Sequence, residues 1–142
     1  MSKDIVEIKV ERIPGAYMPK KAHDPDAGWD ITADDNFKLY RGEQVVVETG
    51  LRMAIPEGYF ALVSEKSGLA LEGISIGGGV IDSGYRGEVC VIIRMFGKFK
   101  EFKRGDKIAQ VLVLPVLDVK WVEVKKLDET DRGTNGFGST GR

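Results

Sequence analysis

The sequence predicts an all-β fold, a sandwich or closed barrel built from many short strands. Glycine and proline turns separate short apolar stretches about every ten residues, a spacing typical of such folds. No segment keeps a helical apolar repeat of 3.6 residues over a dozen positions, which excludes long amphipathic helices. The chain contains 18 glycines in 142 residues, well above the usual ~7%, and this excess also favours turn-rich β structure.

The first strand is indicated by alternation, because Val6, Ile8 and Val10 are separated by charged residues. A loop rich in proline, glycine, aspartate and lysine then covers residues 14–35, with a short ordered island at 27–31. One or two helical turns are expected within residues 64–71. Further strands are expected at residues 45–50, 52–55, 59–64, 108–117 and 119–124.

Residues 89–96 form a strand that is apolar on both faces. Such a strand is expected to be buried on both sides, either within the subunit or at an interface. Cys90 lies in this strand and is therefore expected to be a packed thiol, whose burial raises its pKa and argues against a catalytic role. A single cysteine also excludes an intramolecular disulfide and favours a reducing compartment.

Length and apolar content predict one domain, residues 1–127, followed by a flexible glycine-rich arm at 128–142. The net charge of −1 argues against binding to a nucleic acid polymer, so any related substrate is expected to be small. No apolar run approaches the roughly 18 residues of a membrane span, and no apolar leader is visible. We therefore expect a soluble protein without membrane contact, located in the cytoplasm, or in the host cytoplasm or nucleus if the source is a virus.

The stretch from Gly77 to Glu88 is the candidate reaction centre. Its three consecutive glycines allow the backbone to approach a ligand closely. Asp82 is expected at the tip of a hairpin, with Ser83 and Gly84 as the turn pair. A carboxylate with apolar neighbours at such a tip is suited to act as a general base toward water. The alternative is that these residues form only a surface turn, as most similar triplets do.

Four other stretches carry groups suited to a nucleotide. Residues 27–31 place a carboxylate beside glycine and tryptophan, and residues 65–70 combine the lysine, hydroxyl and glycine that a phosphate oxygen requires. Residues 104–110 end in a glutamine, and residues 132–141 place arginine, phenylalanine and hydroxyls among glycines. Taken singly, each also fits a turn, a helix start or disorder. His23, the only histidine, is assigned to solvent, which argues against a multi-histidine metal site or a Ser-His-Asp triad.

In this order, the five stretches resemble the five motifs of the homotrimeric all-β dUTPase family. The motifs correspond to residues 27–31, 66–70, 79–88, 105–110 and 132–141. The resemblance implies a distorted jelly-roll sandwich of the β-clip type, and a homotrimer whose active sites are shared among three chains. It implies hydrolysis of dUTP to dUMP and pyrophosphate, which keeps uracil out of DNA and supplies dUMP. It also implies Mg²⁺ as the cofactor.

The resemblance implies a role for each motif. Asp82 would orient the water that attacks the α-phosphorus, and Tyr85 would pack against the deoxyribose and exclude a ribose 2′-hydroxyl. Asp30 would hold a water on the Mg²⁺ chelated by the triphosphate. Backbone groups of the third motif, at Gly79, Val80 and Ile81, would recognise the uracil edge. Four residues would lie at the phosphates, namely Lys66, Ser67, Gly68 and Gln110.

The C-terminal arm would complete the site. Arg132 would neutralise the terminal phosphate, and Phe137 would cover the uracil. Gly138, Ser139 and Thr140 would close on the phosphates. Phosphoryl transfer depends chiefly on positioning and charge neutralisation, and such an arm is suited to exclude water after substrate binds.

Three positions depart from the family pattern. Lys66 stands where many members have arginine, so a bidentate phosphate contact becomes a point charge. Glu65 stands where proline is common and adds a negative charge near the polyphosphate. Ile76 stands where some branches use an asparagine to read uracil, so this chain resembles the branch that uses backbone groups.

The same motifs leave two alternative functions open. A dCTP deaminase shares this fold and parts of the second and third motifs, but the arm with arginine, phenylalanine, serine and threonine favours a dUTPase. A dUTP-binding regulator without activity would be expected to have a damaged catalytic set, whereas Asp82, Tyr85 and Arg132 are all present.

Overall fold

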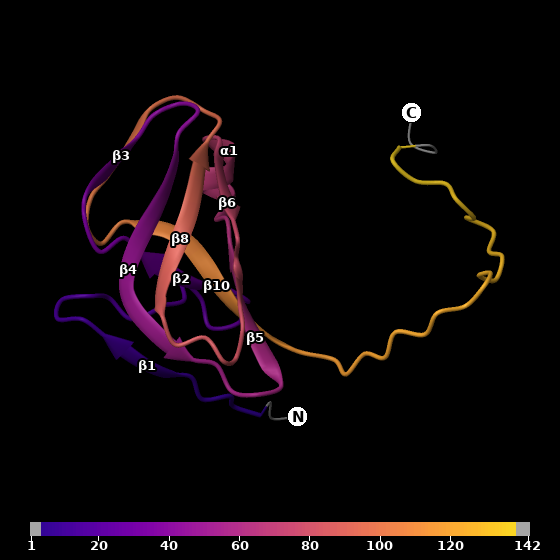
Figure 1. Ribbon diagram of the computed structural model, residues 1–142. Coiled ribbons are helices and arrows are strands. Elements are labelled where there is room, and N and C mark those ends of the chain that lie inside the picture. Colours follow the sequence, from indigo (N-terminus) through magenta and orange to yellow (C-terminus); the bar gives the residue numbers. More distant parts are fainter. Residues whose placement is uncertain (1–3, 139–142) are drawn as a thin grey trace.

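A computed structural model describes residues 4–138 and has the predicted all-β class (Figure 1). Two four-stranded antiparallel sheets form a distorted jelly-roll sandwich, and a two-stranded sheet closes one end. The first sheet has the order β1 (Lys9–Arg12), β4 (Gln44–Ala54), β8 (Glu88–Met95), β6 (Ile74–Gly77). The second has the order β2 (Trp29–Thr32), β10 (Lys107–Pro115), β5 (Tyr59–Ser64), β7 (Val80–Ile81). The small sheet pairs β3 (Phe37–Leu39) with β9 (Lys100–Phe102).

The core lies between the two large sheets. Alternate residues of a strand point to opposite faces, so each sheet contributes every second side chain to the interior. Val91 and Ile93 of β8, and Ala61 and Val63 of β5, are buried in the same core cluster. The stacked rings of Phe37 and Phe102, with centroids 4.6 Å apart, close the end formed by β3 and β9.

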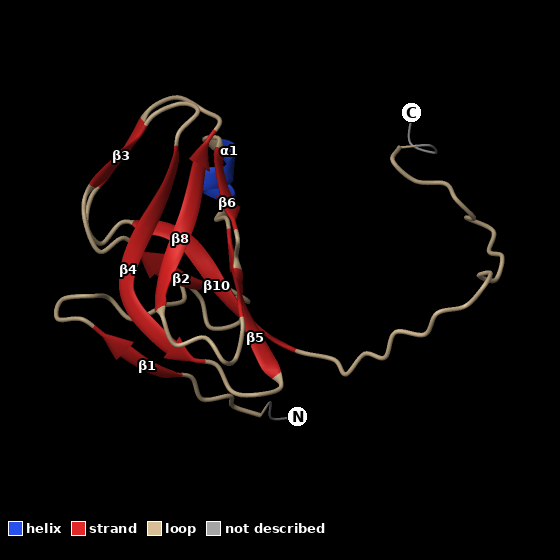
Figure 2. Ribbon diagram, in the orientation of Figure 1, coloured by secondary structure: helices blue, strands red, loops and turns tan. Residues whose placement is uncertain are grey.

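The only helix in the described part of the chain is α1 (Ser67–Leu71), which lies beside β6 (Figure 2). It falls within the range where one or two helical turns were predicted. Among residues 4–138, no helix is long and apolar enough to cross a membrane.

Of the two alternatives predicted for residues 89–96, burial of both faces within the subunit is wrong, whereas burial at an interface stays a prediction. Val89 and Val91 face the core, whereas Cys90 and Arg94 are exposed on the other face. The chain supplies a covering sheet on one side only, so the outer face of β8 is left open. The packed environment expected for Cys90 is therefore absent. Residual burial, and then the negative charges of Glu88 and Glu48, still raise the pKa of the Cys90 thiol.

The predicted strand at residues 119–124 is also wrong. No strand follows Pro115 in the described residues, and side chains from 116 onward are almost all exposed. Figure 1 shows this segment leaving the sandwich in a wide arc. A strand requires a neighbour to pair its backbone N–H and C=O groups, and the sandwich of the same chain offers none here.

Other boundaries differ in smaller ways. The first strand begins at Lys9, although Val6, Ile8 and Val10 show the predicted alternation in their partial burial. The two strands predicted at 45–50 and 52–55 are one strand, β4, with a shift in register beside Gly50. The short strands β3, β6 and β9 were not predicted.

Candidate active site

The three consecutive glycines 77–79, here called the glycine run, connect the two large sheets, since β6 belongs to the first sheet and β7 to the second. Gly78 has a φ of 60°, a conformation that side-chain-bearing residues rarely adopt. A Cβ atom at Gly79 would overlap the carbonyl oxygen of Val63. The carbonyl of Gly79 accepts a hydrogen bond of 2.7 Å from the Val63 N–H. Glycine is therefore needed at 78 for its conformation and at 79 for the close approach to β5.

Asp82 lies in the turn that follows β7. The Tyr85 N–H donates to the Asp82 carbonyl at 3.1 Å, so Ser83 and Gly84 are the central turn residues, as predicted. The predicted hairpin is wrong, however, because β7 pairs with β5 whereas β8 pairs with β4 and β6. The turn connects the two sheets, and the Asp82 side chain is exposed on it.

Tyr85 is held by its hydroxyl, which donates to the carbonyl of Glu88 at 2.8 Å and leaves the ring half-exposed. A Cβ at Gly87 would collide with the same hydroxyl, so the tyrosine lies directly on the backbone. The guanidinium of Arg86 donates to the carbonyls of Ser83, at 2.7 Å, and Tyr85. Arg86 thus stabilises the turn.

Gly78, Asp82 and Tyr85 border a cavity of about 250 Å³, here called the Asp82 pocket. Its floor is the outer face of β8, with Cys90 and Ile92, and its rim includes Val80, Asp82 and Tyr85. The pocket therefore joins a carboxylate, an aromatic ring and an apolar floor.

A second group of predicted residues gathers at the other end of β5, and we call it the Asp30 cluster. Asp30 is buried, with 7% of its surface exposed. Its Oδ1 binds the ammonium of Lys66, and its Oδ2 lies 3.3 Å from the ammonium of Lys107. Burial raises the pKa of Asp30, but the hydrogen bonds and charges of the two lysines outweigh burial, so the pKa is below its usual value.

Gln110 joins the Asp30 cluster through β10, where it lies opposite Asp30. Its Nε2 donates to the backbone carbonyl of Glu65 at 2.9 Å. A Cβ at Gly28 would overlap the Gln110 side chain, which explains the glycine in the first motif.

Lys107 is a residue that the sequence analysis did not single out. Strict alternation would place Lys107 and Gln110 on opposite faces of β10. The register of β10 against β2 shifts between Lys107 and Ala109, which allows both side chains to meet Asp30 and its surroundings. Ile108 and Ala109 are adjacent in the strand and both fully buried. Two consecutive apolar residues at this point are the sequence signal that indicates the irregularity.

Ser67 and Gly68 begin α1 directly after Lys66. The helix bonds of the first turn run from Leu69 and Ala70 to the carbonyl of Lys66. The N–H groups of Ser67 and Gly68 precede these bonds, at exposed positions beside the Asp30 cluster. Lysine, hydroxyl and backbone N–H groups are thus available together, which is the set that phosphate oxygens require.

The Asp82 pocket and the Asp30 cluster are far apart within one chain. Ile81 pairs with Ala61 near the start of β5, whereas Lys66 follows the end of that strand. Asp82 lies one residue further from Lys66, so about six extended residues, or roughly 20 Å, separate the two groups. A single chain therefore does not bring its own Asp82 to its own Lys66.

The described part of the C-terminal arm, residues 128–138, does not reach either group in the single chain. Within this part, Arg132 donates to the carbonyl of Asn135 at 2.9 Å, and Phe137 is fully exposed. Gly138 is the last residue described, and Ser139 and Thr140 lie outside the described residues.

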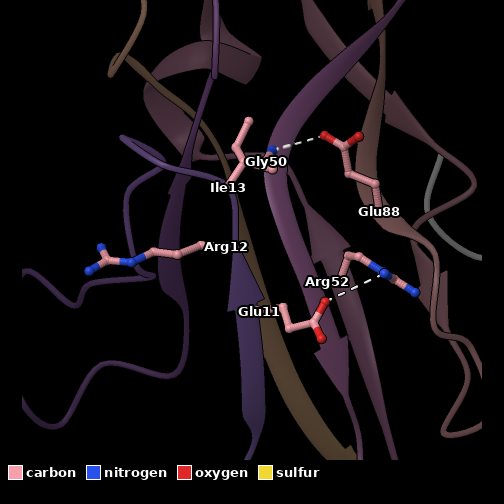
Figure 3. Close-up of a pocket in the computed structure, with 6 residues that line it drawn as sticks. All are labelled: Glu11, Arg12, Ile13, Gly50, Arg52 and Glu88. Carbon is pink, nitrogen blue, oxygen red and sulfur yellow. Dashed lines mark hydrogen bonds and ion pairs between the residues drawn. The ribbon is translucent and has the colours of Figure 1, made fainter.

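Another cavity, of about 430 Å³, lies between β1 and β4 (Figure 3). Its charged groups already have partners, because Arg52 pairs with Glu11 at 3.4 Å, Glu88 accepts from the Gly50 N–H at 2.9 Å and Arg12 donates to the carbonyl of Ala16 at 3.2 Å. The side chain of Arg12 points away from this pair (Figure 3). None of the predicted site residues borders this cavity.

Within residues 4–138, no three histidine, cysteine, aspartate or glutamate side chains are arranged to bind a metal ion directly. The Asp30 cluster offers a single carboxylate, and a lysine binds each of its oxygens. This donor set fits a cation held mainly by water and substrate oxygens better than one held by the protein.

The all-β sandwich thus presents the exposed carboxylate of Asp82 beside one pocket and two lysines on the buried carboxylate of Asp30, groups of the kind that suit a phosphate-bearing substrate. The dUTPase family model matches residues 15–141, and the chain belongs to this family. It is 43% identical to the deoxyuridine 5′-triphosphate nucleotidohydrolase of Clostridium acetobutylicum, over 96% of this chain and 98% of that protein.

Solved structures agree with this assignment. The dUTPase of Staphylococcus bacteriophage 80alpha, solved with dUpNHpp, matches with a TM-score of 0.86 and 26% identity, over 96% of this chain and 99% of that one. A mutant dUTPase from phage phi11 of S. aureus, in which a structural Mg(II) ion was described, matches with a TM-score of 0.77 and 25% identity. That match covers 84% of this chain and 97% of the phage protein.

Proposed function

We propose that this protein hydrolyses dUTP to dUMP and pyrophosphate, with Asp82 as the general base. The observation that carries the proposal is the assembly of four of the five family motifs into two chemically complementary groups. The Asp82 pocket supplies the carboxylate and the surfaces for base and sugar. The Asp30 cluster supplies cations and donors for a polyphosphate.

Asp82 acts on water. Its carboxylate accepts a proton as the water oxygen attacks the α-phosphorus, and the bond to the oxygen that bridges the α- and β-phosphorus breaks. Pyrophosphate leaves with that oxygen. The exposed position of Asp82 at the rim of the pocket leaves space for water between the carboxylate and a substrate.

Selectivity for dUTP arises from the backbone that begins in the glycine run and from Tyr85. The backbone of Gly79, Val80 and Ile81 hydrogen-bonds the uracil edge, and the close contact of Gly79 with Val63 holds that backbone rigid. The Tyr85 ring packs on the deoxyribose, and its hydroxyl is already bound to Glu88, so the ring cannot turn away to admit a 2′-hydroxyl.

The phosphates are bound by Lys66, Ser67, the N–H of Gly68 and Gln110. Positive charge beside free N–H groups stabilises the charge on the phosphate oxygens during attack. When bound with the substrate, Mg²⁺ would neutralise part of the triphosphate charge, and Asp30 would accept hydrogen bonds from water on that ion. The single carboxylate of the Asp30 cluster supports such an indirect role.

The active site is shared between chains of a homotrimer. The separation of roughly 20 Å between Asp82 and Lys66 within one chain supports this arrangement, because a triphosphate cannot span both groups of one subunit. The open outer face of β8 supports it as well, since a neighbouring subunit there would cover the exposed Cys90 and the half-buried Ile92.

Residues 128–142 act as an arm that closes over the bound nucleotide, with Arg132 on the terminal phosphate and Phe137 on the uracil. Gly138, Ser139 and Thr140 complete this closure at the phosphates. The exposure of Phe137 in the single chain supports a partner for its ring outside the sandwich. The free thiol of Cys90 fits a reducing compartment, so we place the enzyme in the cytoplasm.

The test is pyrophosphate release from dUTP, dTTP, dCTP and UTP at equal concentration with Mg²⁺. We expect turnover of dUTP only. Equal rates on all four would contradict the proposed selectivity, and ammonia release from dCTP would identify a deaminase. Tight binding of dUTP without turnover would instead identify a regulator.

A further inference from the structure

Glu65 makes contacts in three directions. It lies between β5 and α1, and its Oε1 accepts a hydrogen bond of 2.9 Å from the backbone N–H of Ile76 in β6. Its Oε2 lies 3.4 Å from the hydroxyl of Ser64. Its backbone carbonyl accepts the bond from Gln110 described above. The side chain is therefore turned toward β6.

The contact with Ile76 joins two sheets at an edge. β6 is the last strand of the first sheet and pairs only with β8, so the N–H of Ile76 has no neighbouring strand on its open side. Glu65 follows a strand of the second sheet and satisfies this N–H with a carboxylate oxygen. The bond from Ile76 lowers the pKa of Glu65, so the carboxylate is ionised at neutral pH.

Glu65 and Val63 together hold both ends of the glycine run. The Glu65 carboxylate fixes Ile76 immediately before Gly77, and the Val63 N–H fixes the carbonyl of Gly79 at 2.7 Å. The glycines between these two points have no side chains that could pack and limit their movement. The two bonds from the β5 segment, together with the pairing of Ile76 and Gly77 with β8, therefore determine where this backbone lies.

We propose that Glu65 is a positioning residue for pyrimidine recognition, which holds the glycine run in the geometry that reads the uracil edge. The inference rests on the proposed function, because it assigns a task to the backbone that contacts the base. Proline at this position, common in the family, has no carboxylate, so this chain uses a different device to fix the strand. Glu65 stays outside the phosphate site, although it neighbours Lys66.

The experiment compares Glu65→Ala and Glu65→Gln in the full-length protein. Glutamine keeps a carbonyl oxygen that can accept the bond from Ile76, whereas alanine removes the acceptor. We expect Glu65→Ala to raise the KM for dUTP by roughly tenfold, the effect of one hydrogen bond to a charged group, with a smaller change in kcat. The ratio of kcat/KM for dUTP to kcat/KM for dCTP should be smaller in Glu65→Ala than in the wild type. In Glu65→Gln this ratio should be close to the wild-type value.

Glu72→Ala is the matched control, because Glu72 is an exposed glutamate just after α1 that pairs with Lys100 instead of β6. It should leave KM and discrimination unchanged. Hydrogen exchange at the Ile76 amide gives a readout that is independent of activity. The amide should exchange faster in Glu65→Ala than in the wild type or in Glu65→Gln. If Glu65→Ala does not fold, Glu65→Asp serves in its place, since its shorter side chain keeps the charge but withdraws the oxygen from Ile76.

Three outcomes would overturn the inference. Discrimination by Glu65→Ala equal to that of Glu72→Ala would show that the contact does not position the base. Tighter dUTP binding by Glu65→Gln than by the wild type would show that Glu65 instead acts by repelling phosphate. Unchanged exchange at Ile76 would show that the bond does not hold β6. Failure of the wild type to hydrolyse dUTP would contradict the proposed function itself and is seen before any variant is made.

Discussion

The ammonium of Lys107 lies 3.3 Å from Oδ2 of Asp30 and joins β10 to β2 at the Asp30 cluster. Lys66, at the end of β5, binds the other oxygen of the same carboxylate. Asp30 thus links three neighbouring segments of one sheet. When Lys66 turns to a phosphate, as proposed, Lys107 remains to hold Asp30 in place.

The first prediction concerns acid stability. The pKa of Asp30 is lowered in the folded protein, so its contribution to stability is fully present above the unfolded pKa of about 3.9 and is lost as pH falls through the lower folded value. We expect Asp30→Asn to cost about 1–3 kcal/mol of unfolding free energy at pH 7, less than for a fully buried pair, because Lys107 is largely exposed. Urea unfolding at several pH values and one protein concentration measures this.

The difference between wild type and Asp30→Asn should shrink as pH falls below about 4. Asp24→Asn, at an exposed loop position, is the control and should follow the wild type at every pH. A difference that is the same at pH 7 and at pH 3 would show that the ion pairs of Asp30 do not contribute to stability.

The second prediction concerns the proposed base. Asp82→Asn keeps the shape of the turn but removes the proton acceptor, so kcat should fall by about 10²- to 10⁴-fold. Binding of the non-hydrolysable analogue dUpNHpp should change little, because the residues assigned to base, sugar and phosphates are intact. Calorimetry and single-turnover kinetics separate the two effects. A variant with more than half of the wild-type kcat would exclude Asp82 as the base.

The third prediction uses two glycines of the same motif. Gly79→Ala would drive a methyl group into the carbonyl of Val63, and such overpacking costs roughly 1–3 kcal/mol and displaces the glycine run. Gly84→Ala has open space around its Cβ position and should be nearly neutral. Thermal unfolding and KM for dUTP should both change for Gly79→Ala and stay constant for Gly84→Ala. Equal behaviour of the two variants would contradict the close approach of Gly79 to β5.

The fourth prediction concerns the arm. Deletion of residues 132–142 removes groups that make no contact with the sandwich in the described part, so the melting temperature should be unchanged. The kcat/KM for dUTP should fall at least about tenfold, because the closing arm is lost. Steady-state kinetics and calorimetry on the truncated and full-length proteins test this. Full activity of the truncated protein would show that the arm has no part in catalysis.

The fifth prediction concerns the shared site. The mass in solution should be three times the 15.6 kDa of the chain. Asp82→Asn and the double variant Lys66→Ala/Ser67→Ala should each be almost inactive alone. After unfolding and refolding an equal mixture, about a quarter of the sites in randomly mixed trimers should combine an intact Asp82 with an intact Lys66 from a neighbour. No recovered activity in a mixture that forms mixed trimers would mean that both groups act from one chain.

Local patterns were sufficient for much of the fold. The apolar run at residues 89–96 and the glycine and proline turns identified most of the longer strands, because a strand of six or more residues leaves an apolar stretch between turn residues. Strands of three or four residues, such as β3 and β9, have too few positions to show a period. They form because a neighbouring segment pairs with them, which no local pattern records.

The all-β class, the family and most residues of the candidate site could be predicted from the sequence, because turn chemistry and the five motifs are properties of short contiguous stretches. How these residues group, and that Lys107 joins them, depends on the tertiary structure. The register shift in β10 brings Lys107 to Asp30, the open edge of β6 turns Glu65 to Ile76, and the length of β5 separates Asp82 from Lys66. Each of these depends on the pairing of segments distant in the chain, and a shift in that pairing would change the contacts without altering any local sequence pattern.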